Sequence, residues 1–128
     1  MHEVAVRPGD IIVLATDGVF DNLFDDEIGR LLADAALRGG GEVDVCDVAS
    51  GKPPSAQRLA ELIATEARTA SLQRARRTPF EVGAAEAGHQ MPGGKLDDVS
   101  VICVRVLSGM EEGGAHCAPP MAPPHSRL

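Results

Sequence analysis

Two acidic residues stand at the ends of two apolar segments that are far apart in the chain. Asp17 follows the run Ile11 to Ala15, and Asp97 comes just before the alternating segment 99–106. If these segments are strands that meet in the fold, their carboxylates form a site for a hard divalent cation, because Mg²⁺ and Mn²⁺ prefer oxygen ligands and usually keep several waters. Asp17 and Asp97 are therefore our candidate metal ligands.

Each carboxylate also has an ordinary structural explanation. An Asp-Gly pair after a strand, such as Asp17-Gly18, most often makes a turn in which Asp bonds its own backbone and Gly accepts a positive φ. Asp97 follows the Gly93-Gly94 turn and precedes an apolar strand, where an unpaired charge would be costly unless water or a cation meets it. The metal-site interpretation therefore depends on both segments together.

Four short stretches of the sequence resemble a known enzyme family. Residues 15–21 (ATDGVFD) and 97–101 (DDVSV) are similar to motifs in the C-terminal part of the metal-dependent protein phosphatases of the protein phosphatase 2C family. Residues 78–80 (TPF) and 93–95 (GGK) resemble the organelle-associated branch of that family, which is related to the T-cell-activation phosphatase homologue. The resemblance covers roughly residues 4–107.

This resemblance implies an enzyme that hydrolyses phosphoserine and phosphothreonine in proteins with a water activated by two Mg²⁺ or Mn²⁺ ions. Asp17 and Asp97 would hold one of these ions, and the implied partner is a phosphoprotein substrate. The implied fold is α/β (α+β), the C-terminal portion of an α-β-β-α sandwich with mainly antiparallel sheets. The family branch suggests a mitochondrion or plastid, and any targeting segment would lie upstream of Met1.

The resemblance covers only the later motifs of the family. An acidic strand and an Asp-Gly-x-Gly-Gly turn, which supply further ligands, have no counterpart here. We therefore expect residues 1–107 to be a partial catalytic domain whose candidate partner is the missing N-terminal half, and residues 108–128 to be a disordered Gly- and Pro-rich tail. Such a chain should have little or no activity alone. The alternative is a non-catalytic fragment or degenerate homologue that acts as an interaction module.

Composition argues against several other functions. The 128 residues carry a formal net charge of −7, which disfavours a nucleic-acid partner. No apolar stretch approaches the ~20 residues that cross a bilayer, so no membrane partner is expected. Cys46, Cys103 and Cys117 are an odd number at wide spacings, which indicates neither a disulfide framework nor a zinc site. A metal site in the tail at His116, Cys117 and His125 lacks a fourth ligand.

Two strands and two helices are expected to position the candidate ligands. The strands, Ile11 to Ala15 and 99–106, are apolar on both faces and should be covered on both. The spacing of apolar residues predicts one helix that begins with Asp25 as its N-cap and stops at Gly39. A second helix should open at Ser55, carry basic residues in its last turn and end by Pro79; the basic residues are Arg74, Arg76 and Arg77.

The polar neighbours of the two candidate ligands receive lesser roles. Asp98 should point away from Asp97, because successive side chains of a strand face opposite sides, and should only support the site. Asp21 is expected to brace the loop after Asp17-Gly18. Lys95 is a weak candidate for contact with substrate phosphate.

Overall fold

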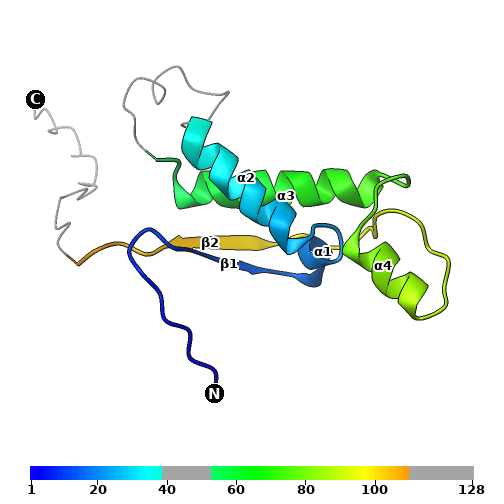
Figure 1. The fold of residues 1–128 in the computed structure, drawn as a ribbon. Coiled ribbons are helices and arrows are strands. Elements are labelled where there is room, and N and C mark those ends of the chain that lie inside the picture. The colour runs from blue at the N-terminus through cyan, green and yellow to red at the C-terminus, as the bar shows by residue number, and fades with distance from the viewer. Residues whose placement is uncertain (39–52, 110–128) are drawn as a thin grey trace, which may run out of the picture.

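The structure is a computed structural model that describes residues 1–38 and 53–109. Its elements follow in chain order: β1 (Ile11–Ala15), α1 (Asp17–Phe20), α2 (Asp25–Arg38), α3 (Ala56–Leu72), α4 (Pro79–Glu86) and β2 (Val101–Arg105). The strands form a two-stranded antiparallel sheet, α3 packs on β2, and α2 packs on α3 (Figure 1). The expected mixture of helices with an antiparallel sheet is confirmed.

The pairing of β1 with β2 sets the geometry of the site. Ile11 lies opposite Arg105 and Ala15 lies opposite Val101, so the last residue of β1 is beside the first residue of β2. The Thr16 N–H extends the ladder by one bond, donating to the Ser100 carbonyl over 3.0 Å. The segments that carry Asp17 and Asp97 therefore leave the sheet at the same end.

One face of this sheet forms the core with α1, α2 and α3. The inward residues of the strands, Val13, Ala15, Val101 and Cys103, pack against a fully or nearly fully buried cluster of apolar side chains. That cluster consists of Val19, Leu23, Ile28, Ile63, Ala67 and Ala70. In both strands the inward residues are two positions apart, because side chains along a strand point to opposite faces in turn.

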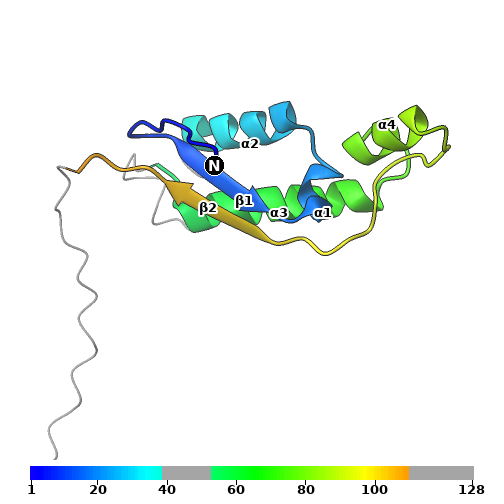
Figure 2. The same cartoon turned by 90° about the horizontal axis from the view of Figure 1, so that it is seen from below.

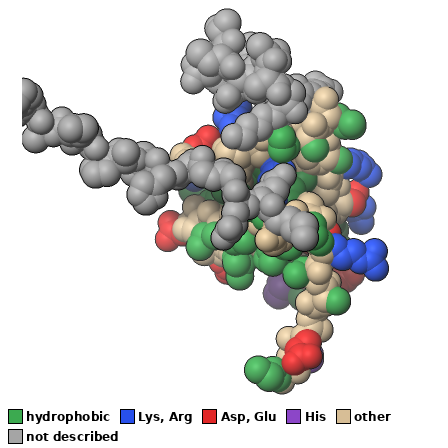
Figure 3. Space-filling view, turned by 90° about the vertical axis from the view of Figure 1, so that its left-hand side faces the viewer, with side chains coloured by type: hydrophobic (Ala, Val, Ile, Leu, Met, Phe, Trp, Pro, Cys, Tyr) green, Lys and Arg blue, Asp and Glu red, His purple; other side chains and the backbone are tan. Residues whose placement is uncertain are grey.

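The opposite face of the sheet is uncovered by the described residues. The side chains Ile12, Leu14, Ile102 and Val104 are 39%, 56%, 62% and 44% exposed. Figure 2 views the molecule from this side, with both strands in front of α3, and Figure 3 shows hydrophobic side chains at the surface of the described part. The expectation that both strands are covered on both faces is thus wrong for residues 1–38 and 53–109, since all helices that contact the sheet lie on its other side.

The boundaries of α2 and α3 differ from the predicted ones at two places. Asp25 is the first residue of α2 rather than its cap, and the preceding Phe24 N–H is bonded by Glu27 Oε2 at 2.8 Å. Ser55 caps α3 as predicted, accepting from the Arg58 N–H. However, α3 ends at Leu72 and has no basic residue in its last turn. Arg74, Arg76 and Arg77 follow the helix, so the predicted interaction with its dipole is wrong.

Proline begins a helix here instead of ending one. Thr78 is the N-cap of α4, its hydroxyl accepts from the Glu81 N–H, and Pro79 occupies the first turn, where its missing N–H costs nothing. The same hydroxyl donates to the Gly93 carbonyl over 2.7 Å in a fully buried position. Thr78 therefore ties the start of α4 to the loop that leads to the candidate site.

Arg76 connects two helices. Its guanidinium lies 2.9 Å from Glu27 of α2 and 2.7 Å from Glu66 of α3, and its side chain is only 20% exposed. Burial disfavours the charge on Glu27, but the hydrogen bonds from the Phe24 N–H and from Arg76 outweigh it and hold the pKa of Glu27 below its usual value. Arg76 is thus a structural bridge, and Arg77 lies over the Phe24 ring.

Several sequence predictions fall outside the described residues. These are the connection across residues 39–52 with Cys46, and almost all of the tail 108–128 with His116, Cys117 and His125. Within the described ranges, none of the helices has the length and apolar character needed to span a membrane.

The buried side of α3 offers a direct test of this packing. Leu59→Ala removes a side chain that is 1% exposed, and we expect it to lower the free energy of unfolding by about 2–5 kcal/mol through lost burial and a residual cavity. Leu37→Ala makes the same chemical change at a site on α2 that is 84% exposed and should stay within about 0.5 kcal/mol of the original chain. Urea unfolding followed by circular dichroism measures both, and equal effects would contradict the packing described.

Candidate metal centre

Three carboxylates converge where β1 ends and β2 begins. Asp17 opens α1, Asp21 caps its C-terminus, and Asp97 lies in the loop before β2 (Figure 1). One oxygen from each lies within 4.8 Å of the other two. The structure therefore brings together the two ligand candidates of the sequence analysis and adds Asp21, which was expected only to brace the loop.

The spacing of Asp17 and Asp21 explains why the third carboxylate joins the cluster. The segment after β1 forms one helical turn, with the Asp21 N–H donating to the Asp17 carbonyl over 2.7 Å. Residues four apart on a helix lie on the same side, so both carboxylates face Asp97. Treating the Asp-Gly pair as a simple turn concealed this relation, although the spacing itself was visible in the sequence.

The Lys95 ammonium lies among these carboxylates. Its Nζ is 2.7 Å from Asp21 Oδ2, 2.9 Å from Asp97 Oδ2 and 4.0 Å from Asp17 Oδ2. The hydrogen bonds that Lys95 donates to Asp21 and Asp97 raise the pKa of Lys95 well above its usual value. The Lys95 ammonium, helped by the Asp98 N–H, holds the pKa of Asp97 below its usual value. The chain's own cation therefore already lies against two of the three carboxylates.

A buried amide holds the backbone of this region in place. Asn22 is fully buried, and its Nδ2 donates to the carbonyls of Gly18 and Lys95, each over 2.8 Å. Its Oδ1 accepts from the Lys95 N–H at 2.9 Å. One side chain thus joins α1 to the loop before β2 and satisfies backbone groups that would be costly to leave unpaired. Asn22 was not predicted to belong to the site, because nothing in the sequence around it indicates this role.

Thr16 fixes the other side of the same loop. Its hydroxyl donates to the Asp98 carbonyl over 2.8 Å and accepts from the Ser100 N–H at 3.0 Å. A β-carbon at Gly18 would overlap that Asp98 carbonyl oxygen, so this position needs glycine. Asp98 contributes its backbone to the site: its N–H donates to Asp97 Oδ1 over 2.9 Å, while its side chain is exposed.

The donor set fits a hard divalent cation. It consists of carboxylate oxygens alone, on side chains whose exposure ranges from 31% for Asp21 to 74% for Asp17, so an ion and its waters have access. Asp21 and Asp97 also contact the Lys95 ammonium, so an entering ion would share these two carboxylates with it.

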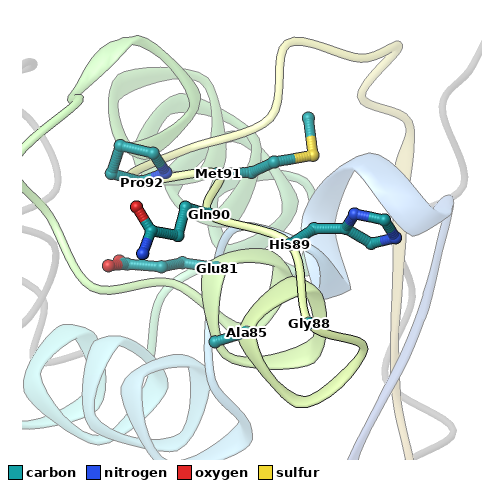
Figure 4. A pocket seen from close by; sticks show the side chains of 7 residues that line it. All are labelled: Glu81, Ala85, Gly88, His89, Gln90, Met91 and Pro92. Carbon is teal, nitrogen blue, oxygen red and sulfur yellow. The ribbon is translucent and has the colours of Figure 1, made fainter.

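A separate cavity lies between α4 and the loop that follows it. Its volume is about 500 Å³, and it is lined by Glu81 and Ala85 of the helix and by the loop 88–92 (Figure 4). His89, expected to be a solvated loop residue, is exposed on this loop. None of the three clustered carboxylates lines this cavity.

Comparison with known proteins gives the family. No family model matches the chain. The chain is 39% identical over 86% of its length to "Probable protein phosphatase 2C 55" of Arabidopsis thaliana, of which it spans 21%. It is 37% identical over 82% of its length to "Probable protein phosphatase 2C 80" of the same species, of which it spans 22%. It is also 33% identical over 80% of its length to the "Protein phosphatase PTC7 homolog fig" of Drosophila yakuba, of which it spans 28%.

A solved structure agrees with these sequence relatives. The photosystem II phosphatase PBCP matches 80% of this chain with a TM-score of 0.61 and 26% sequence identity, over 38% of its own chain. The match confirms the mixed fold with a small antiparallel sheet. The chain spans less than a third of the three curated relatives described above. By sequence and by fold, it belongs to the protein phosphatase 2C family.

Proposed function

We propose that this chain carries part of the metal site of a protein phosphatase that acts on phosphoserine and phosphothreonine, with Asp17 and Asp97 as ligands to Mg²⁺ or Mn²⁺. The observation that supports it is the convergence of three carboxylates at one end of the β1–β2 sheet, in a chain whose relatives are named protein phosphatases. Asp21 is the further oxygen donor within reach of the same ion.

The chain's own residues prepare this site before any ion enters. Asp17 and Asp97 supply anionic oxygens, Thr16 and Asn22 hold the two backbone segments, and Lys95 balances part of the negative charge. A divalent ion held there would neutralise charge on a phosphoryl group and lower the pKa of a bound water. Within the described ranges we assign no catalytic acid or base.

The proposed activity belongs to a longer domain. The chain spans a limited share of its relatives, so we place the remaining ligands and most of the substrate surface on sequence beyond it. The uncovered apolar face of the sheet is a surface on which such a missing half would pack. A mitochondrial or plastid location, and the absence of nucleic-acid and membrane partners, stay predictions.

The second candidate function is a non-catalytic interaction module. The exposed face formed by Ile12, Leu14, Ile102 and Val104 favours it, because such a surface suits a protein partner. The phosphatase needs the clustered carboxylates to bind metal, whereas the interaction module does not. Two experiments separate these functions.

The first experiment measures metal binding by the 128-residue chain. Asp97→Asn and Asp17→Asn should each weaken Mn²⁺ binding by at least about tenfold in isothermal titration calorimetry, because affinity follows the charge and number of oxygen ligands. Asp98→Asn is the matched control, since its exposed carboxylate lies outside the cluster, and should bind Mn²⁺ normally. Equal binding by all three variants would rule out the proposed ligands.

The second experiment restores the longer domain. We expect the isolated chain to have little activity on a phosphoserine peptide, and a chain completed with an N-terminal half from a relative to be active with Mn²⁺. In that completed domain Asp17→Asn should lower kcat/KM roughly a hundredfold, as expected for loss of a metal ligand. Strong turnover by the isolated chain would contradict the partial-site proposal, and an Asp17→Asn domain with unchanged activity would favour the interaction module.

A further inference from the structure

We propose that Lys95 is a built-in counter-ion of the acidic cluster, which competes with the entering metal for Asp97 and Asp21 and thereby sets metal affinity. This inference rests on the proposed metal site and assigns to Lys95 a role different from contact with substrate phosphate. It makes Lys95 a positioning residue, because it acts on the ion through the carboxylates that they share.

The ammonium occupies the place where the carboxylates converge. It makes short charged hydrogen bonds to two of the three, at 2.7 Å to Asp21 and 2.9 Å to Asp97. The third carboxylate, Asp17, is 4.0 Å away and 74% exposed, which leaves it open to solvent. Two members of the cluster are therefore engaged by the chain's own cation, and an ion approaching from solvent meets Asp17 first.

The rest of Lys95 is fixed. Its N–H and C=O are both bonded to the buried Asn22 amide, at 2.9 and 2.8 Å. The ammonium also lies 5.8 Å from the centre of the Phe80 ring, and the backbone N–H of Phe80 donates to the Asp21 carbonyl. With the backbone clamped on both sides, the ammonium can move aside only by rotation of its side chain, and it stays close to the cluster after an ion has entered.

The charge balance makes this competition consequential. Three carboxylates and one ammonium leave the cluster with a formal charge of −2, which one divalent ion neutralises. To bind Asp97, the ion must displace the ammonium from it. The ammonium then stays close to the bound ion as a second positive charge. Two positive charges a few ångströms apart repel each other, and a divalent ion doubles the repulsion that a single charge would feel from the ammonium. Lys95 therefore keeps the affinity lower than the three carboxylates alone would give.

Removing the charge of Lys95 tests the idea. Lys95→Met keeps the aliphatic stem and the backbone bonds to Asn22, and we expect it to bind Mn²⁺ about tenfold more tightly than the original chain in isothermal titration calorimetry. Lys95→Arg keeps the charge and should not tighten binding. Arg30→Met is the control for net charge, because Arg30 pairs with Asp26 on the surface of α2 at 77% exposure, and it should leave Mn²⁺ affinity unchanged.

A stability measurement gives a second readout. Without the ammonium, the carboxylates repel one another until a cation arrives. The rise in the thermal midpoint on adding Mn²⁺ should therefore be larger for Lys95→Met than for the original chain, since the stabilisation by a ligand grows with the logarithm of the ratio of its concentration to its Kd. Circular dichroism without metal checks that each variant is folded, and Lys95→Gln is the second uncharged variant.

The outcomes separate this inference from the proposed function. If the original chain binds Mn²⁺ and both uncharged variants bind equally or more weakly, the role of Lys95 is wrong while the metal site stands. If neither the original chain nor the variants bind Mn²⁺, both proposals fail. If both uncharged variants are unfolded, Lys95 is needed for the fold itself, which contradicts a side chain that an ion can displace.

Discussion

The antiparallel register of β1 and β2 is the constraint on which the acidic cluster depends. Ala15 pairs with Val101, and Thr16 continues the pairing through bonds to Asp98 and Ser100. A slip of one residue would turn the inward apolar side chains to the opposite face, so the core that α3 covers strongly favours this register. Because this register places the end of β1 beside the start of β2, Asp17 and Asp97 lie close together although they are distant in the chain.

Around that junction, hydrogen bonds of buried polar side chains hold the loop in place, a role that aromatic packing has in many domains. The sequence has three Phe and neither Trp nor Tyr, and two of its fully buried side chains are Asn22 and Thr78. Each joins the loop before β2 to a helical segment near the cluster, Asn22 to α1 and Thr78 to α4. Because a buried polar group is costly when it loses its partner, these bonds fix the loop in one conformation and so hold Asp97 beside α1.

The sequence pattern predicted the parts of the fold that are governed by local chemistry. A continuous apolar run predicted β1, and Ser55 predicted the start of α3 as its N-cap. Pro79 was predicted to end a helix, but proline is also common in the first turn of a helix. The signal for a helix start is Thr78 directly before it, with Glu81 three positions after this N-cap. The partners of Lys95 and Asn22 could not be predicted, since each depends on contacts across more than seventy positions of the chain.

A diffraction experiment can show whether Asp17 and Asp97 bind a metal ion. Crystals of the 128-residue chain grown with Mn²⁺ would be measured at a wavelength where manganese scatters anomalously. We expect a manganese peak in direct contact with carboxylate oxygens of Asp17 and Asp97, with the Lys95 ammonium withdrawn from Asp97. A map in which Lys95 still bridges Asp21 and Asp97, with no peak between Asp17 and Asp97, would contradict it.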